Sequence, residues 1–419
     1  MKIKKELTNT GIYLLFSMVS SGIGFVGFII LTHFFQPQEF GRIGLFFSLQ
    51  FFIAPLVSLS CNGLIAVNKV TLDSTQYRLF QQTCVGLALI AFMACEMCIF
   101  GFWLTGKLPD WLIWIAPLFA LTRMLSDMAG AEYLVEQRSI TYGLLSVADT
   151  CVALCLTILL CIWTPPSAAN RIFAMLVGDI LLLVVRYWGR VSIFTNPKFR
   201  TAYTRPILEF GIPTMLAVAG GWGLNESDKF IIATTRGMEA AGIYTAAAVL
   251  AGIMMTFNQS VTNALFPGFF KALAANEQRI RVILFEYMTI FVLLALGFAV
   301  IIISGYLLVG TYILPPKYHT VKNLFIALCF SGVAVSVFRP LSLLADYFRL
   351  ARVKSLAVLL SGGGAFCVIY LGVRKGSLMW APIGISFGYL LGAVVLITSL
   401  MIKGLPNDAN KSDSEEISS

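Results

Sequence analysis

The sequence predicts an all-α polytopic membrane protein of about twelve transmembrane helices, and three observations carry this prediction. The 419 residues are 58% hydrophobic and only 12% charged, against about 25% charged residues in soluble globular proteins. The mean hydropathy is +0.84. The apolar residues form continuous runs long enough to cross a bilayer as helices, whereas barrel strands would alternate. These features exclude a disordered chain, a disulfide-stapled secreted domain and most soluble enzymes.

Each predicted span is justified by its length and by its scarcity of charge. The first, second, fifth, eighth, ninth, eleventh and twelfth contain an uninterrupted run without Asp, Glu, Lys or Arg, and the others carry isolated charges. The fifth extends back to about Tyr142, which places Asp149 inside it. In chain order the spans are Gly11–Phe35, Ile43–Asn68, Leu79–Gly106, Trp111–Ala131, Thr150–Asn170, Ile172–Trp188, Ile207–Thr235, Ala240–Phe270, Tyr287–Pro316, Asn323–Leu344, Ser355–Val373 and Gly376–Ile402.

The Lys and Arg residues predict the orientation of the spans. With the N-terminus inside, 18 of the 30 lie in inside segments and 8 in outside segments. Cytoplasmic loops carry the excess of Lys and Arg, so both termini are expected in the cytoplasm. The same bias, together with contact to anionic membrane lipids, explains the net charge of +9 without nucleic acid.

A long basic loop divides the spans six and six. We expect an N-terminal lobe over 1–189, a cytoplasmic loop over 190–206, a C-terminal lobe over 207–403 and a polar cytoplasmic tail over 404–419. The halves align weakly at an offset of 201 residues, which sets Phe40–Leu45 against Ala241–Ala246. The equivalent pairs include Gly41 with Gly242 and Asn62 with Asn263. Parallel repeats of this kind bind substrate between them, near the middle of the membrane.

Ionisable residues inside spans are expensive, so they usually face a bundle interior or a water-filled cavity. Arg123 and Asp127 are four residues apart on one helix face and can pair. Pairing that locks helices together and contact with a substrate both remain open for them. The other in-span charges are Glu96, Asp149, Asp179, Arg186, Glu226, Asp228, Lys229 and Arg339, whereas Glu132, Glu209 and Asp346 are assigned to the cytoplasmic rim.

No motif of enzyme chemistry stands out. The chain has no Walker motif and no H-E-x-x-H. The chain has only two histidines, and its cysteines lie in or beside apolar spans. We therefore expect no metal site and no cofactor. The loops are too short for a catalytic domain, so we expect a transporter and not an enzyme.

Several segments resemble one family. Asp228–Ile232 followed by Gly237–Ala247 looks like the start of the second half of polysaccharide flippases, as does Gly211–Thr214. Phe34–Gly41 followed by Ser48 resembles the first hairpin of the same family. The whole chain also fits in length and span count. It therefore resembles a Wzx-type O-antigen flippase of the multidrug/oligosaccharidyl-lipid/polysaccharide exporter superfamily.

This resemblance implies the movement of undecaprenyl-diphosphate-linked oligosaccharide repeat units to the periplasmic leaflet of the bacterial inner membrane. Two six-helix lobes would surround a central cavity. A gradient of H⁺ or Na⁺ would drive the transport. The chain's own charges suit this role, because a diphosphate needs cations and sugars need amides. The candidates are Arg123, Arg186, Lys229 and Arg339 for the diphosphate, Asn62, Asn225 and Asn263 for the sugars, and Asp127, Asp179 and Asp228 for the coupling ion.

Three alternatives remain. A cation-coupled multidrug exporter of the same superfamily would have a similar architecture, and the acids would then matter more than the arginines. A lipid II flippase usually resembles a fourteen-span chain. A membrane polysaccharide polymerase would need a large loop with catalytic residues, and the largest outside loop runs only from about Tyr306 to Lys322. The flippase reading also leaves room for a polymerase and a chain-length regulator as protein partners.

Overall fold

The computed structural model describes residues 2–106, 110–188, 201–275, 279–348 and 350–402. Helices fill nearly all of this part of the chain, which contains no strand. The predicted tail over 404–419 and most of the predicted inter-lobe loop lie outside the described residues. The helices are α1 Lys2–Phe34, α2 Pro37–Ser58, α3 Asn62–Thr71, α4 Ser74–Leu104, η1 Trp111–Ile115, α5 Ala116–Val135, α6 Ser139–Trp163, α7 Ala168–Arg186, α8 Thr201–Asn225, α9 Ser227–Arg236, α10 Met238–Ala275, α11 Ile280–Ile313, η4 Pro316–Tyr318, α12 Val321–Tyr347, α13 Ala351–Arg374 and α14 Trp380–Ile402.

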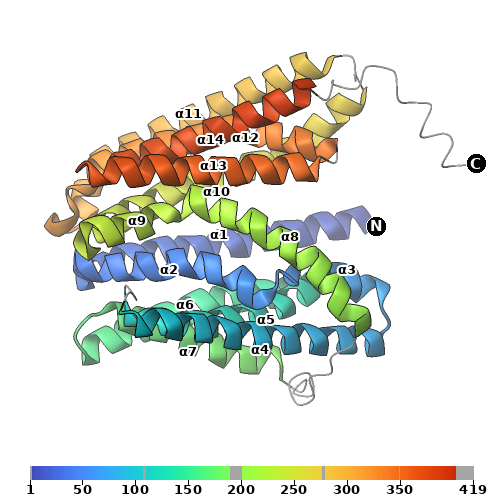
Figure 1. Ribbon diagram of the computed structural model, residues 1–419, viewed down its shortest axis with the longest axis horizontal. Helices are drawn as coiled ribbons and strands as arrows, with labels where there is room; N and C mark the ends of the chain where they lie inside the picture. The colour runs from blue at the N-terminus through green and yellow to red at the C-terminus, as the bar shows by residue number, and fades with distance from the viewer. Residues whose placement is uncertain (1, 107–109, 189–200, 276–278, 349, 403–419) are drawn as a thin grey trace, which may run out of the picture. The chain divides into compact units, whose positions relative to one another are not determined.

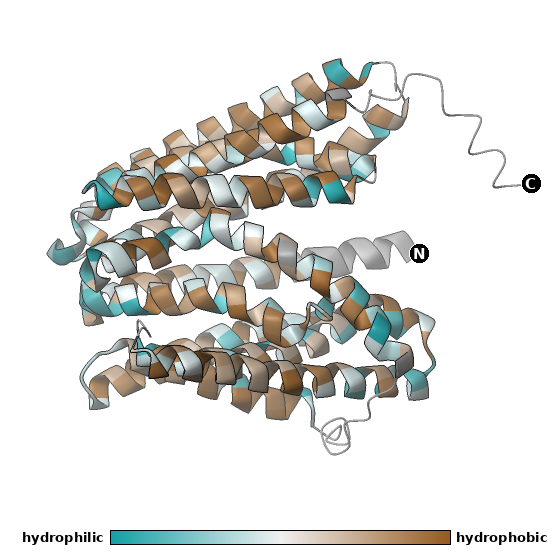
Figure 2. Ribbon diagram, in the orientation of Figure 1, coloured by the Kyte–Doolittle hydropathy of each residue, from teal (hydrophilic) through white to brown (hydrophobic). Residues whose placement is uncertain are grey.

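The helices confirm the predicted fold class. Twelve segments of the described chain are long and apolar enough to cross a membrane. Each overlaps one predicted span, and several helices run beyond the apolar run that predicted them. The seventh ends at Asn225 and not at Thr235, because α8 and α9 are separate helices. Hydrophobic residues dominate the middle of the helices, and hydrophilic residues gather toward many of their ends (Figure 2). That distribution is what a bilayer requires, because the hydrocarbon core solvates apolar side chains and the interfaces solvate polar ones.

The chain forms two compact units that differ from the sequence halves. Unit 1 holds the residues up to Val218 together with Lys229–Ala246 and Thr311–Val321. Unit 2 holds Ala219–Asp228, Ala247–Gly310 and the residues from Lys322 onward. In unit 1, α1 packs on α6, α6 on α7, and α2 on α5; in unit 2, α13 packs on α14 (Figure 1). Unit 1 therefore includes short segments of the second sequence half.

The second span is interrupted at residues 59–61, between α2 and α3. Leu59 and Ser60 adopt φ values of 49° and 50°, in the left-handed region. The backbone N–H of Ser60 donates to Ser58 Oγ at 3.2 Å, which satisfies one donor at the break. Gly211 of α8 packs on the Leu59 carbonyl, where a Cβ would collide. Each left-handed non-glycine residue costs about 1–3 kcal/mol, so surrounding contacts hold this break in place.

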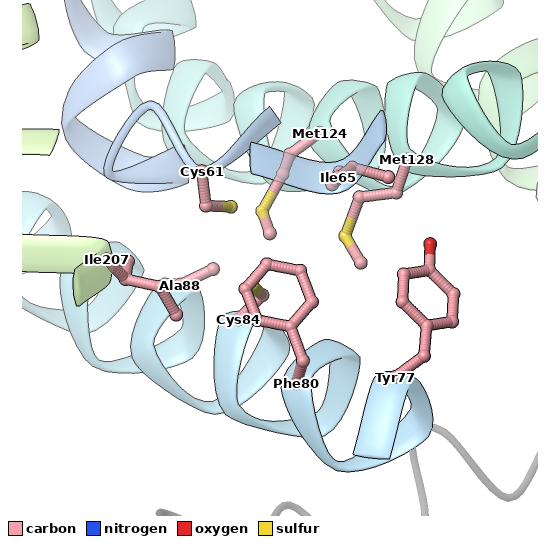
Figure 3. Packing of buried hydrophobic residues seen from close by; sticks show 9 residues of the cluster. All are labelled: Cys61, Ile65, Tyr77, Phe80, Cys84, Ala88, Met124, Met128 and Ile207. Carbon is pink, nitrogen blue, oxygen red and sulfur yellow. The ribbon is translucent and has the colours of Figure 1, made fainter. Parts of the chain in front are cut away.

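Sulfur-containing and aromatic side chains pack α3, α4, α5 and the start of α8 together. Met124 and Met128 of α5 point toward Phe80 and Cys84 of α4 (Figure 3). All four are at most 2% exposed. Ile207 extends the cluster to α8. This packing fixes the rotation of α5 about its axis, and therefore the direction of its polar side chains.

A charged cluster joins the connections at one end of unit 1. Arg42 of α2 donates to both oxygens of Asp110, at 2.5 and 3.1 Å. Asp110 also caps η1 by accepting from the N–H of Leu112 at 3.0 Å. Glu39 accepts from the N–H of Ala168, the first residue of α7, at 2.6 Å. A carboxylate is favourable there because the helix dipole is positive at that end.

The N-termini of α2 and α10 cross in backbone contact within unit 1. A Cβ built on Gly41 would collide with the Met238 carbonyl, and one built on Gly242 would collide with the Pro37 carbonyl. The two built Cβ atoms would lie 3.0 and 2.9 Å from the backbone nitrogen of the opposite glycine. Only glycine permits helices to approach so closely.

Unit 2 is held by small residues and buried amide contacts. Gly223 of α8 packs against the backbone of Gly362 in α13. Asn258 of α10 donates to the Gly332 carbonyl at 2.8 Å and accepts from Ser336 at 3.0 Å, both on α12. Asn258 is 2% exposed. Interhelical bonds of this kind satisfy polar groups that water cannot reach.

Candidate functional site

A polar cavity of 200 Å³ lies among α5, α6 and α7 in unit 1. Its lining includes two cations and two carboxylates inside predicted spans, together with hydroxyl groups. The polar side chains of the lining include Arg123, Asp127, Tyr142, Ser146, Asp149 and Arg186. Ionisable groups around a water-accessible space inside a membrane bundle mark a candidate functional site.

The periodicity of α5 explains why its charges face this cavity. Arg123, Asp127 and Gly130 follow each other at spacings of three to four residues and share one face of the helix. Met124 and Met128, one residue further along, face the buried cluster on the other side. Burial of the methionines therefore directs the charged residues into the cavity.

Arg123 is held by two carboxylates on neighbouring helices. Its Nη1 donates to Asp149 Oδ2 on α6 at 2.8 Å and to Asp179 Oδ1 on α7 at 3.1 Å. The Arg123 side chain is 46% exposed, whereas those of Asp149 and Asp179 are 16% and 2% exposed. Arg123 and Asp127 share one face of α5 and could pair, but the ion pairs of Arg123 in the described structure are with these two interhelical carboxylates.

Asp179 retains a free oxygen. Its Oδ2 is buried and has no hydrogen-bond partner among the described residues. Arg186 lies seven residues further along α7, but the ion pair that Asp179 forms in the described structure is with Arg123. A buried carboxylate oxygen without a donor is an acceptor site for a proton or a metal cation.

Asp149 belongs to the site, although from the sequence it is only an in-span acid and not one of the predicted binding residues. The signal was its place in the fifth span, since α6 begins at Ser139 and Asp149 therefore lies within the helix. Its partner is 26 residues away on another helix. Spacing within one helix gives no information about such a contact.

Asn62 and Arg186 flank the same cavity. Asn62, at the start of α3, donates its amide to Asp127 Oδ2 at 3.4 Å. The Asn62 Oδ1 and the Arg186 Nη1 are buried without hydrogen-bond partners in the described part of the chain. The structure thus brings together five of the predicted site residues: Asn62, Arg123, Asp127, Asp179 and Arg186.

The remaining predicted residues lie elsewhere. Asn225 is already bonded at both ends of its amide: Nδ2 donates to the Gly221 carbonyl at 3.0 Å, and Oδ1 accepts from Tyr389 at 2.6 Å. Asn263 is exposed and accepts from Gln259 at 3.0 Å. The other three differ in exposure: Asp228 is buried, whereas Lys229 and Arg339 are half-buried.

Glu132, which is expected at the cytoplasmic rim, lies near the end of α5 and is buried. It is 2% exposed and lies among α4 and α5. Tyr77 donates its hydroxyl to Glu132 Oε1 at 3.0 Å, and the Gln81 amide donates to the same oxygen. The sequence signal was the polar pair Tyr77 and Gln81, four residues apart on one face of α4.

A larger hollow in unit 1 has a different chemistry. It measures 560 Å³ and is lined by α2 and α4, with contributions from η1, α8 and α9. Leu56, Phe52 and Phe102 are typical of its apolar lining. Such a surface suits a hydrocarbon chain and offers nothing to a phosphate or an ion.

Comparison with known proteins places the chain. Residues 7–273 match the family model described as "Polysaccharide biosynthesis protein". No curated protein sequence matches the chain. An inward-facing multidrug resistance MATE family transporter of the MOP superfamily superposes with a TM-score of 0.68 at 14% identity, covering 95% of this chain and 99% of that one. The lipid II flippase MurJ in an inward closed conformation gives 0.67 at 10% identity, covering 93% and 87%.

The structural likeness shows a shared fold and nothing about function, because both sequence identities are below 15%. The family match is stronger, since it covers more than half of the sequence. Twelve membrane-spanning helices agree with it. The chain is a multi-pass membrane protein that belongs to the polysaccharide biosynthesis protein family and has the fold of MOP-superfamily transporters.

Proposed function

We propose that the chain is a flippase for undecaprenyl-diphosphate-linked O-antigen oligosaccharides, moving them from the cytoplasmic to the periplasmic leaflet of the bacterial inner membrane. Membership of the polysaccharide biosynthesis family supports a carbohydrate substrate. The fold shared with a lipid II flippase supports a lipid-linked one. The bias of Lys and Arg supports cytoplasmic termini. The two six-span halves, 1–189 and 207–403, would then alternate around the substrate.

The observation that carries the ion-coupling part of this proposal is Arg123 held between Asp149 and Asp179. The cavity and its immediate wall contain two cations, Arg123 and Arg186, against three carboxylates, Asp127, Asp149 and Asp179. This excess of negative charge suits a bound H⁺ or Na⁺ better than it suits a diphosphate. We therefore assign Arg123 to the ion site and not to the substrate.

The geometry supports a competition between the ion and Arg123. Both carboxylates hold the same guanidinium nitrogen. An ion on Asp179, at its free Oδ2, would neutralise one of the two charges and weaken the hold on Arg123. Because the bonds of Arg123 tie α5 to α6 and α7, ion binding would loosen the contact among these helices. Such a bistable contact can couple ion binding to a change of conformation.

The diphosphate requires cations that carboxylates have not already bound. Arg186 and Arg339, which form no ion pair among the described residues, fit this requirement. Lys229 is a candidate for its charge alone. Arg186 supports the assignment because its Nη1 is buried without a hydrogen-bond partner in the described residues. Asn62 is the amide best placed for a sugar, since its Oδ1 has no hydrogen-bond partner there either. Asn225 would have to give up two existing bonds, and Asn263 remains a candidate.

A cation-coupled multidrug exporter is the second candidate. The negative balance of the cavity favours it, because a cationic drug would be attracted to the same carboxylates. The fold shared with a multidrug resistance MATE transporter agrees. The two functions differ in the sign of the substrate charge, and therefore in whether Arg339 or the acids decide binding.

Complementation tests the proposal. The chain is expressed in flippase-null bacteria that make different repeat units, and surface polysaccharide is scored at matched protein levels. We expect the wild type to restore polysaccharide in a strain with the matching unit, and Arg339→Ala and Asp179→Asn to lose it. Arg205→Ala is the control, because Arg205 is 81% exposed and pairs only with Glu209 in the described structure.

Two results would contradict the flippase. The first is the absence of restored polysaccharide in every strain, together with resistance to cationic drugs conferred by the wild type. The second is full restoration by both Arg339→Ala and Asp179→Asn. The first result would establish the exporter, and the second would remove the proposed substrate and ion sites.

A further inference from the structure

The crossing of α2 and α10 obeys the internal repeat of the sequence. The offset of 201 residues that aligns the two halves pairs Gly41 with Gly242, and it also pairs Pro37 with Met238. In the structure a Cβ on Gly41 meets the Met238 carbonyl, and a Cβ on Gly242 meets the Pro37 carbonyl. The contact is therefore reciprocal between equivalent residues. A reciprocal contact of this kind lies on a twofold axis.

The next turn of each helix continues the pattern. Gly44 corresponds to Thr245 at the same offset, and a Cβ built on Gly44 would lie 3.0 Å from the Thr245 Cβ. Both residues are buried. At this level the Thr245 side chain packs directly against Gly44 and leaves no room for even one added carbon atom.

A tyrosine reinforces the crossing. Tyr318 of η4 is fully buried, and its hydroxyl donates to the Phe35 carbonyl at 3.1 Å. Its ring meets Phe40 edge to face, with centroids 5.7 Å apart. Beside it, the Lys317 ammonium reaches the His33 carbonyl at 3.4 Å, and burial lowers the pKa of Lys317. These contacts join the α11–α12 connection to the end of α1 and the start of α2.

All of these segments lie on the same side of the membrane in the predicted topology. They are the end of the first span, the starts of the second and eighth, and the connection between the ninth and tenth, and each falls on the outer face. Segments of the second sequence half thus bind the first half at its outer end, all within unit 1.

We propose that the Gly41–Gly242 crossing, fastened by Tyr318, is the closed outer gate of the transporter and separates once in every transport cycle. The inference rests on the proposed function, because a substrate released to the outside has to pass this level. It goes further by naming the residues that close the path. Their small size permits a backbone seal that other residues would prevent.

A reversible cross-link tests whether the gate has to open. In a background without the nine native cysteines, Gly44→Cys with Thr245→Cys would form a disulfide across the crossing. The built Cβ separation is 3.0 Å, so the helices have to move apart slightly to reach the usual separation of about 3.8 Å. Oxidation should reduce transport by about tenfold or more, and reductant should restore it. The matched control is Gly388→Cys with Ala365→Cys, where the built Cβ lies 2.8 Å from the Ala365 Cβ between α14 and α13.

The control cross-link should leave transport unchanged, because α13 and α14 are consecutive helices of the C-terminal half and pack along each other. Transport by the oxidised gate pair at the level of its reduced form would overturn the proposal. So would an equal loss in the control pair, because a general effect of cross-linking would then explain the result.

A second measurement is independent of the substrate. Ser48 lies one turn below Gly44 on the same face of α2 and is fully buried. Gly242→Leu would wedge the crossing apart, so labelling of Ser48→Cys from outside with a membrane-impermeant maleimide should increase. Gly388→Leu, an equal change at a crowded glycine of unit 2, should not increase it. Equal labelling in both would refute the gate. Increased labelling in a chain that restores no polysaccharide would refute only the flippase.

Discussion

Replacement of Arg123 by alanine should destabilise the protein strongly. The change leaves two carboxylates without their shared cation, and one of them, Asp179, is 2% exposed. Removing one partner of a buried ion pair costs about 3–5 kcal/mol. Arg123 itself is 46% exposed to the cavity, so screening by solvent reduces the expected loss to about 2–3 kcal/mol. The assay is reversible unfolding of the purified protein in mixed detergent and SDS.

Two variants make this experiment decisive. Arg205→Ala removes an arginine from an exposed pair with Glu209, and it should cost less than about 1 kcal/mol. Adding Asp179→Asn to Arg123→Ala should recover part of the loss, because it removes the unpaired buried charge. The reasoning is refuted if Arg123→Ala costs no more than Arg205→Ala, or if the double variant is less stable than Arg123→Ala alone.

Three further substitutions probe other polar contacts by the same unfolding assay. Arg42→Ala leaves Asp110 unpaired, so we expect a loss of about 2 kcal/mol; a loss within error would show that the N-cap bond alone satisfies Asp110. Asn258→Ala leaves a carbonyl and a hydroxyl of α12 without their partner, at a cost of about 2 kcal/mol, and an unchanged midpoint would contradict this. Tyr389→Phe removes one donor to Asn225 and should cost about 1 kcal/mol; a larger loss than that of Asn258→Ala would reverse the predicted order.

Hydropathy is sufficient to predict the spans, because the requirement of a bilayer for about 20 apolar residues is local in sequence. It does not predict the break at Leu59 and Ser60. Neither residue is glycine or proline, and the left-handed conformation is held by contacts with α8 that no local pattern reveals.

The sequence predicts which types of residue form the candidate site, but it does not predict which of them form ion pairs with one another. The polar in-span residues Arg123, Asp127 and Asp179 could be selected because charges in spans are rare. Their partners depend on which helices are neighbours, and helix spacing alone favoured Asp127 over Asp149. Glu132 was missed for the same reason, since the donors that bury it lie on another helix.

The place of Gly41 and Gly242 on the internal twofold axis has a consequence for descent. In an ancestor made of two identical six-span chains, one glycine would have met its own copy, so a single codon would have decided both sides of the contact. In the present chain the two sides of the contact are encoded separately, and the equivalent positions Gly44 and Thr245 differ. The two central positions are both glycine. A substitution at one of them can be compensated only by displacement of the opposite helix, because its partner has no side chain left to shorten.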